Sequence, residues 1–90
     1  MRLVHLVLTS AATPRPGAAD AERVLDTLWA HLEPASGIEH IRVRPGPDRI
    51  DLGLFLRGDG PAAPTATEAE RAGIARLLSR IPEWRPEPPH

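Results

Sequence analysis

Three side chains in the sequence have the chemistry of an acid–base site: His5, His40 and Asp51. Imidazole exchanges a proton near neutral pH and can ligate a metal, and a neighbouring carboxylate would orient it. The three residues lie in separate segments, so they meet only if those segments pair in one particular register. No HxH or HxxxH pattern accompanies them. The sequence therefore indicates no metal site, and a catalytic role for these three is an alternative interpretation, not the leading one.

Ser10, Thr13 and Arg15 form a second group, in a loop that leads from a short apolar run into a predicted helix. Free backbone amides and the helix dipole favour anions at such a place. Gly17 is the only glycine of this loop, and neither GxGxxG nor GxxxxGK[ST] is present. These three residues are candidates for anion binding, with a plain connecting loop as the alternative.

The composition argues against several classes of function. The 90 residues carry 11 basic and 12 acidic side chains, so the clustered positive charge of a DNA- or RNA-binding protein is not expected. The absence of cysteine removes disulfides and thiolate nucleophiles and favours a cytoplasmic location. No apolar run approaches the roughly 20 residues of a membrane-spanning helix. We expect no nucleic-acid partner, no membrane and no cofactor.

The first two thirds of the chain show the periodicities of strands and one helix. A short run at 3–8, aliphatic except for His5, predicts a buried strand. From Asp20, the predicted N-cap, to Pro34 an apolar stripe recurs at helical spacing. The segments 38–44 and 50–57 alternate with period two around a Pro-Gly-Pro-Asp turn, which predicts a hairpin. The helix stripe consists of Ala21, Val24, Leu25, Leu28 and Leu32.

A second helix is predicted to begin with two overlapping Thr-x-x-Glu boxes, in which hydroxyl and carboxylate satisfy free backbone amides. The boxes are Thr65 with Glu68 and Thr67 with Glu70. Pro82 ends the helix, and Trp84 is expected to fold back over the core. Residues 85–90 are rich in proline and are expected to form a tail outside the fold. The apolar stripe of this helix is Ile74, Leu77, Leu78 and Ile81.

These elements predict an α+β protein, a two-layer βαββα sandwich formed by one domain at residues 1–84. A right-handed crossover makes the first two strands parallel, and the hairpin makes the third antiparallel to the second. With the third strand in the middle, the sheet order is 1-3-2, a split βαβ unit. The layout resembles the ferredoxin-like fold without its last strand, and the likeness is one of topology only. The first strand would then keep an open edge.

Alternation also predicts which side chains lie under the helices. The leucines and isoleucines of the hairpin, with Glu39 beside Ile41 and Val43, are expected on the covered face. The uncovered face would hold a mixture of apolar, basic and acidic side chains. Its members would be Leu3, His5, Val7, His40, Arg42, Arg44, Asp51, Gly53, Phe55 and Arg57.

The leading functional hypothesis is a non-enzymatic accessory module that binds a protein partner, most simply as a homodimer. It would use the uncovered face or the open edge of the first strand. The predicted partner-binding residues are Arg42, Arg44, Phe55 and Arg57, because arginine and aromatic side chains are enriched at binding hot spots.

The alternative is a small-molecule-binding protein or a modest enzyme. It would use His5, His40, Asp51 and Arg42 on the same face. No GxSxG or other nucleophile motif supports a reaction of a particular type.

Overall fold

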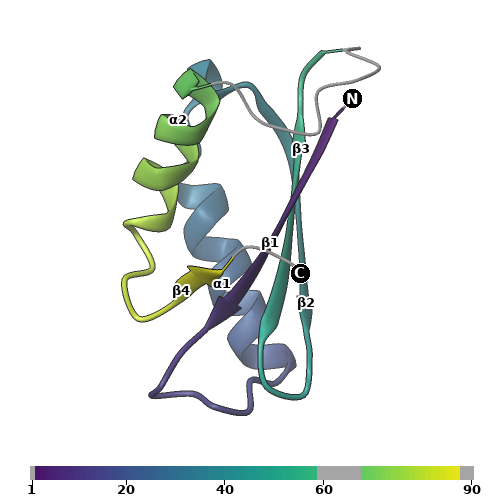
Figure 1. Ribbon diagram of the computed structural model, residues 1–90, viewed down its shortest axis with the longest axis vertical. Coiled ribbons are helices and arrows are strands. Elements are labelled where there is room, and N and C mark those ends of the chain that lie inside the picture. The colour runs from purple at the N-terminus through teal and green to yellow at the C-terminus, as the bar shows by residue number, and fades with distance from the viewer. Residues whose placement is uncertain (1, 59–67, 88–90) are drawn as a thin grey trace.

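The computed structural model describes residues 2–58 and 68–87, which form an α+β fold with a four-stranded antiparallel sheet and two helices. The sheet order is β2-β3-β1-β4, and each pair of neighbours is antiparallel. Both helices lie on the same side of the sheet (Figure 1). The elements are β1 (Arg2–Thr9), α1 (Ala18–Ala30), the 3-10 helix η1 (Pro34–Ser36), β2 (Ile38–Pro45), β3 (Ile50–Leu56), α2 (Glu68–Leu78) and β4 (Arg85–Glu87).

The central strand β3 shows why the sheet has one covered and one uncovered face. Successive side chains of a strand point to opposite faces. Ile50, Leu52, Leu54 and Leu56 are fully buried, whereas Asp51, Gly53 and Phe55 between them are partly exposed. The predicted hairpin and its alternation are therefore confirmed.

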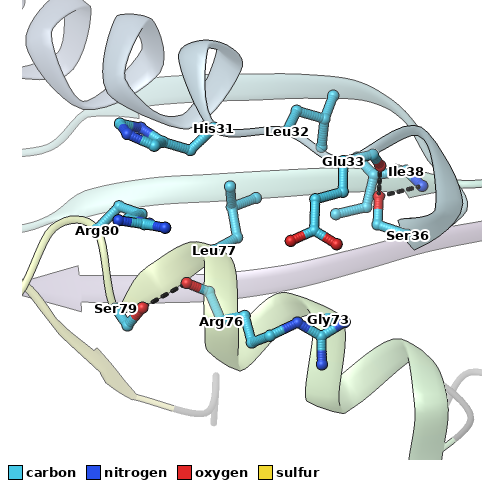
Figure 2. Close-up of a pocket in the computed structure, with 10 residues that line it drawn as sticks. All are labelled: His31, Leu32, Glu33, Ser36, Ile38, Gly73, Arg76, Leu77, Ser79 and Arg80. Atoms are coloured by element: carbon cyan, nitrogen blue, oxygen red, sulfur yellow. Dashed lines mark hydrogen bonds between the residues drawn. The ribbon is translucent and has the colours of Figure 1, made fainter.

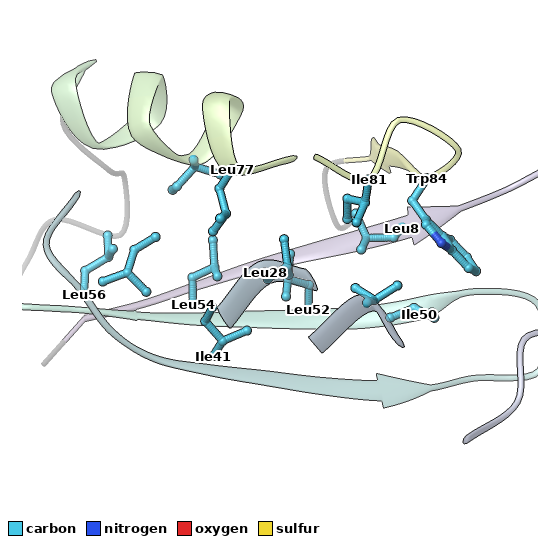
Figure 3. Packing of buried hydrophobic residues seen from close by; sticks show 13 residues of the cluster. Leu8, Leu28, Ile41, Ile50, Leu52, Leu54, Leu56, Leu77, Ile81 and Trp84 are labelled. Carbon is cyan, nitrogen blue, oxygen red and sulfur yellow. The ribbon is translucent and has the colours of Figure 1, made fainter. Parts of the chain in front are cut away.

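The core fills the space between the sheet and the two helices (Figure 3). Val24 and Leu28 of α1 and Ile74 and Leu77 of α2 pack against the buried side chains of β3, as their helical spacing predicted. Trp84 is only 6 % exposed and joins the same cluster, so its predicted position over the core is confirmed.

The fourth strand corrects two predictions. Residues Arg85–Glu87, expected in a tail outside the fold, form β4 and pair with Val7, Leu8 and Thr9. The edge of β1 is therefore not open at its C-terminal end. The predicted order 1-3-2 of the first three strands is nevertheless present within the observed order β2-β3-β1-β4. Pro86 lies opposite Leu8, in an edge strand where the missing N–H of proline is tolerated. The remainder of the predicted tail, 88–90, lies outside the described residues.

The start of α1 also differs from the prediction. Gly17 is the N-cap, and Asp20 is the third helical residue instead of the cap. The Asp20 carboxylate accepts a hydrogen bond from the Gly17 N–H at 2.8 Å, so it still satisfies one of the free amides of the first turn. Its negative charge also offsets the positive end of the helix dipole.

At α2, the threonines of both predicted capping boxes lie outside the described residues, and the helix is described from Glu68. The carboxylate of Glu70 accepts hydrogen bonds from both terminal nitrogens of the Arg2 guanidinium. The side chain predicted to serve only the helix terminus thus connects α2 to the beginning of β1.

A β-bulge in β2 overturns the predicted position of Glu39. The pairing with β3 shifts between Ile38 and His40, so one extra residue enters β2. Ile38 is consequently buried with Ile41, and Glu39 is exposed, with Oε1 3.5 Å from Nε of Arg57. Alternation alone cannot foresee such an insertion.

In the described parts of the chain, neither helix is long and apolar enough to cross a bilayer.

Candidate functional site

The uncovered face of the sheet gathers most of the side chains that the sequence singled out. Strand register arranges them in three rows across β1, β3 and β2. The rows are Leu3–Phe55–His40, His5–Gly53–Arg42 and Val7–Asp51–Arg44. Within the described residues, no helix covers this face. The observed register therefore brings these residues together in neighbouring positions of the sheet.

The centre of this face is hollow because Gly53 has no side chain. The depression has a volume of about 310 Å³. It is lined by Leu3, His5, Arg42, Arg44, Asp51, Gly53 and Phe55. A Cβ atom at Gly53 would lie 3.4 Å from Cδ1 of Leu3 and 3.7 Å from Cβ of Arg42, both ordinary contact distances. Gly53 does not have a positive φ, so its missing side chain matters for the shape of the surface and not for the backbone.

His5 and Asp51 meet diagonally across β1 and β3. Nε2 of His5 lies 3.3 Å from Oδ1 of Asp51, and Nε of Arg49 lies 3.8 Å from the same oxygen. The Asp51 side chain is 32 % exposed and that of His5 is 46 % exposed, so water screens this contact. The pair predicted for acid–base chemistry is therefore brought together, on an open surface.

His40 does not join that pair. Asp51 and Phe55 are four residues apart in β3, about 13 Å along the strand, and His40 pairs with Phe55. The His40 ring lies 5.5 Å from the ring of Phe55 and 6.1 Å from that of Trp29, between centroids. The expected cluster of two histidines and an aspartate is therefore not assembled. In residues 2–58 and 68–87, no three acidic, histidine or cysteine side chains are grouped to hold a metal.

The four predicted partner-binding residues separate into two sets. Arg42, Arg44 and Phe55 surround the hollow. Arg57 lies beyond the end of β3. Its guanidinium faces Glu39, and its backbone N–H donates to the Gly37 carbonyl. Arg57 is thus tied to the end of the sheet and does not line the hollow.

The anion-binding candidates lie elsewhere, between β1 and α1. Ser10 is buried, its carbonyl accepts from the Thr13 N–H at 3.2 Å, and Arg15 is exposed. The Asp20 carboxylate already occupies the Gly17 amide, at the end of the helix where an anion would bind. The buried Ser10 hydroxyl has no hydrogen-bond partner among the described residues, but the occupied Gly17 amide argues against an anion at the helix end. The anion site stays a prediction.

A second hollow, of about 180 Å³, lies on the helical side between η1 and α2 (Figure 2). Arg76 and Arg80 contribute positive charge to its lining, and Glu33 contributes negative charge. Arg76 lies in the last turn of α2, where its charge offsets the helix dipole.

The serine hydroxyls of this second hollow are already engaged. Ser36 Oγ donates to the Glu33 carbonyl at 2.7 Å, and Ser79 Oγ donates to the Arg76 carbonyl at 2.5 Å. No sequence pattern indicates this hollow, because its shape depends on how η1 meets α2. The arrangement stabilises two helix ends and leaves no hydroxyl hydrogen for a ligand.

No sequence pattern indicated the neighbour of His40 or the hollow. Trp29 of α1 is 42 % exposed, and its ring lies 6.1 Å from that of His40, between centroids. The hollow over Gly53 was not anticipated, although a glycine in the middle of an alternating strand is a known sign of close approach by another group.

Comparison of the chain with models of known protein families, with curated proteins and with solved structures found no match in any of the three.

Proposed function

We propose that this protein is a non-enzymatic interaction module that self-associates through the uncovered face of its sheet. The observation that carries the proposal is the exposure of apolar side chains there. Leu3 is 54 % exposed, and Phe55 is partly exposed in the neighbouring strand. Apolar side chains clustered on an otherwise polar face are typical of binding surfaces.

The face has a shape that suits a second copy of itself. In a two-fold interface, a surface must be complementary to itself. Leu3 is exposed at the rim of the hollow, and its Cδ1 would lie 3.4 Å from a Cβ at Gly53. Two faces related by a two-fold axis can therefore each place the exposed side of Leu3 against the hollow of the other.

The pairing of β4 with β1 favours the face over the edge as the route of association. The hydrogen-bonding groups of β1 at Val7–Thr9 are already opposite β4. Strand addition at that end of β1 would have to displace β4.

We also propose a ferredoxin-like fold and a cytoplasmic location. The element order βαββαβ and the sheet order β2-β3-β1-β4 support a ferredoxin-like layout that includes a short last strand. The cysteine-free sequence supports a cytoplasmic location.

Sedimentation analysis of a Leu3→Arg variant tests self-association. The wild-type chain is expected to sediment as a dimer at roughly 100 µM, a concentration at which weak homodimers are populated. Leu3→Arg should sediment as a monomer, because it removes the projecting apolar group and adds charge at a contact. Ala75→Arg, at an exposed position of α2, is the matched control and should leave the dimer intact.

Far-UV circular dichroism would establish that both variants are folded. A wild-type chain that remains monomeric at this concentration would refute the proposal. Dimers that persist in Leu3→Arg but dissociate in Ala75→Arg would move the interface to the helical side.

A further inference from the structure

Among the described residues, the two arginines beside the hollow, Arg42 and Arg44, have no acidic partner, although a carboxylate lies on the same face. Asp51 pairs with Arg44 across the strands, but its contacts are with His5 and Arg49. In the part of the chain that the structure describes, neither Arg42 nor Arg44 forms an ion pair. The hollow therefore presents two uncompensated guanidinium groups from one strand.

The other side of the hollow is apolar. Leu3 and Phe55 are cross-strand partners, and Gly53 leaves the floor between them and Arg42 without a side chain. A volume of about 310 Å³ accommodates a flat organic group. Such a group would cover apolar surface that now faces water.

From this combination we infer that the hollow over Gly53 binds an amphipathic carboxylic acid. The carboxylate lies between Arg42 and Arg44, where the planar guanidinium groups donate paired hydrogen bonds. The apolar body lies across Gly53 against Leu3 and Phe55. This inference does not rest on self-association, although both use the same face.

The position of Asp51 favours a singly charged ligand over a phosphate. Its carboxylate lines the same hollow, in the row of Arg44. A like charge nearby disfavours added negative charge, and the penalty is larger for a dianion.

Amide NMR titration with naphthoate tests the inference, with naphthalenemethanol as a neutral probe of similar shape and inorganic phosphate as a probe of charge alone. Naphthoate at about 1 mM, a weak-binding regime, should shift the amides of Arg42, Gly53 and Leu3 saturably. Naphthalenemethanol and phosphate should each bind at least about tenfold more weakly, because each lacks one of the two interactions. Equal affinity for the neutral probe would overturn the inference.

Three variants locate the site. Arg42→Gln and Arg44→Gln should each weaken naphthoate binding by about tenfold, the usual effect of losing a charge-assisted hydrogen bond. Gly53→Val should abolish binding by filling the floor. Arg80→Gln, in the hollow on the helical side, is the matched control and should change nothing. Loss of binding in Arg80→Gln alone would move the site to that hollow and refute the inference.

Sedimentation of the same protein at roughly 100 µM separates this inference from the proposed function. The titrations use protein below the concentration at which it self-associates, so a second copy does not cover the hollow. A chain that binds naphthoate but stays monomeric at roughly 100 µM refutes only self-association. A chain that dimerises at higher concentration but does not bind naphthoate refutes only the ligand site.

Discussion

Leu54 and Phe55 are neighbours in β3 and lie on opposite sides of the sheet. Leu54 is fully buried beneath the helices, whereas Phe55 is partly exposed and its ring lies 5.5 Å from that of His40. The division of the sheet into a covered face and an uncovered face passes between these two residues. Their substitution should therefore have different consequences.

Leu54→Ala should destabilise the fold by about 3 kcal/mol, because it opens a cavity in the core. Phe55→Ala should lower the free energy of unfolding by only about 1 kcal/mol, since its ring is already partly in water. Urea denaturation measures both values. A larger loss for Phe55→Ala than for Leu54→Ala would contradict the observed orientation of β3.

Gly37 and Gly53 should respond differently to alanine. Gly37 has φ of 80°, in the left-handed region that alanine disfavours, so Gly37→Ala should cost about 1 kcal/mol of stability. Gly53 has no such constraint and has room for a methyl group. Gly53→Ala should leave stability unchanged or raise it by up to about 1 kcal/mol, through loss of chain entropy in the unfolded state. Thermal melts that rank the two variants in the opposite order would refute this account.

The Arg2–Glu70 pair should contribute to stability more than an ordinary surface pair. The two side chains are only 16 % and 14 % exposed, and Arg2 Nη2 also donates to the Arg57 carbonyl at 3.0 Å. Arg2→Gln should lower the melting temperature by about 5 °C, a size typical of one lost interaction in a small domain. Arg23→Gln is the control, because Arg23 is 78 % exposed in its pair with Asp20 and should change little.

The same pair should hold its arginine charge throughout the neutral pH range. The hydrogen bond to Glu70 raises the pKa of the Arg2 guanidinium above its ordinary value, against a lowering by burial. A raised pKa gives stability that is present at lower pH and is lost only as pH rises through the folded value. The difference in melting temperature between wild type and Arg2→Gln should thus be the same at neutral and mildly alkaline pH. A difference that disappears in mildly alkaline buffer would contradict the assignment.

Self-association should strengthen with salt. Two copies that meet face to face bring Arg42 and Arg44 of each chain close together, and neither arginine has an acidic partner in the described residues. The screening length falls from about 30 Å at 0.01 M salt to about 8 Å at 0.15 M, which reduces this repulsion. Sedimentation should show a severalfold lower dissociation constant of the dimer at the higher salt concentration. The double variant R42Q/R44Q should lose this dependence, and weaker association at high salt would instead indicate an acidic partner surface.

Much of the fold could be predicted from local pattern. Alternation in β3 correctly separated Leu54 from Phe55, and the helical stripes correctly identified Leu28 and Leu77 as core residues. These predictions hold because covalent geometry fixes the direction of each side chain relative to its neighbours along the chain. Composition excluded disulfides with the same certainty, because a count of cysteines does not depend on which residues are in contact.

The sequence by itself determined three of the four strands, the two helices and, apart from Glu39, the sheet face to which the hairpin side chains belong. Only the tertiary structure decided that β4 covers the end of β1, that a bulge exposes Glu39, and that His5 meets Asp51 while His40 lies with Phe55. These facts depend on register and on contacts between segments far apart in the chain. A shift of one residue reverses the face of every side chain in a strand, and no local pattern fixes that shift.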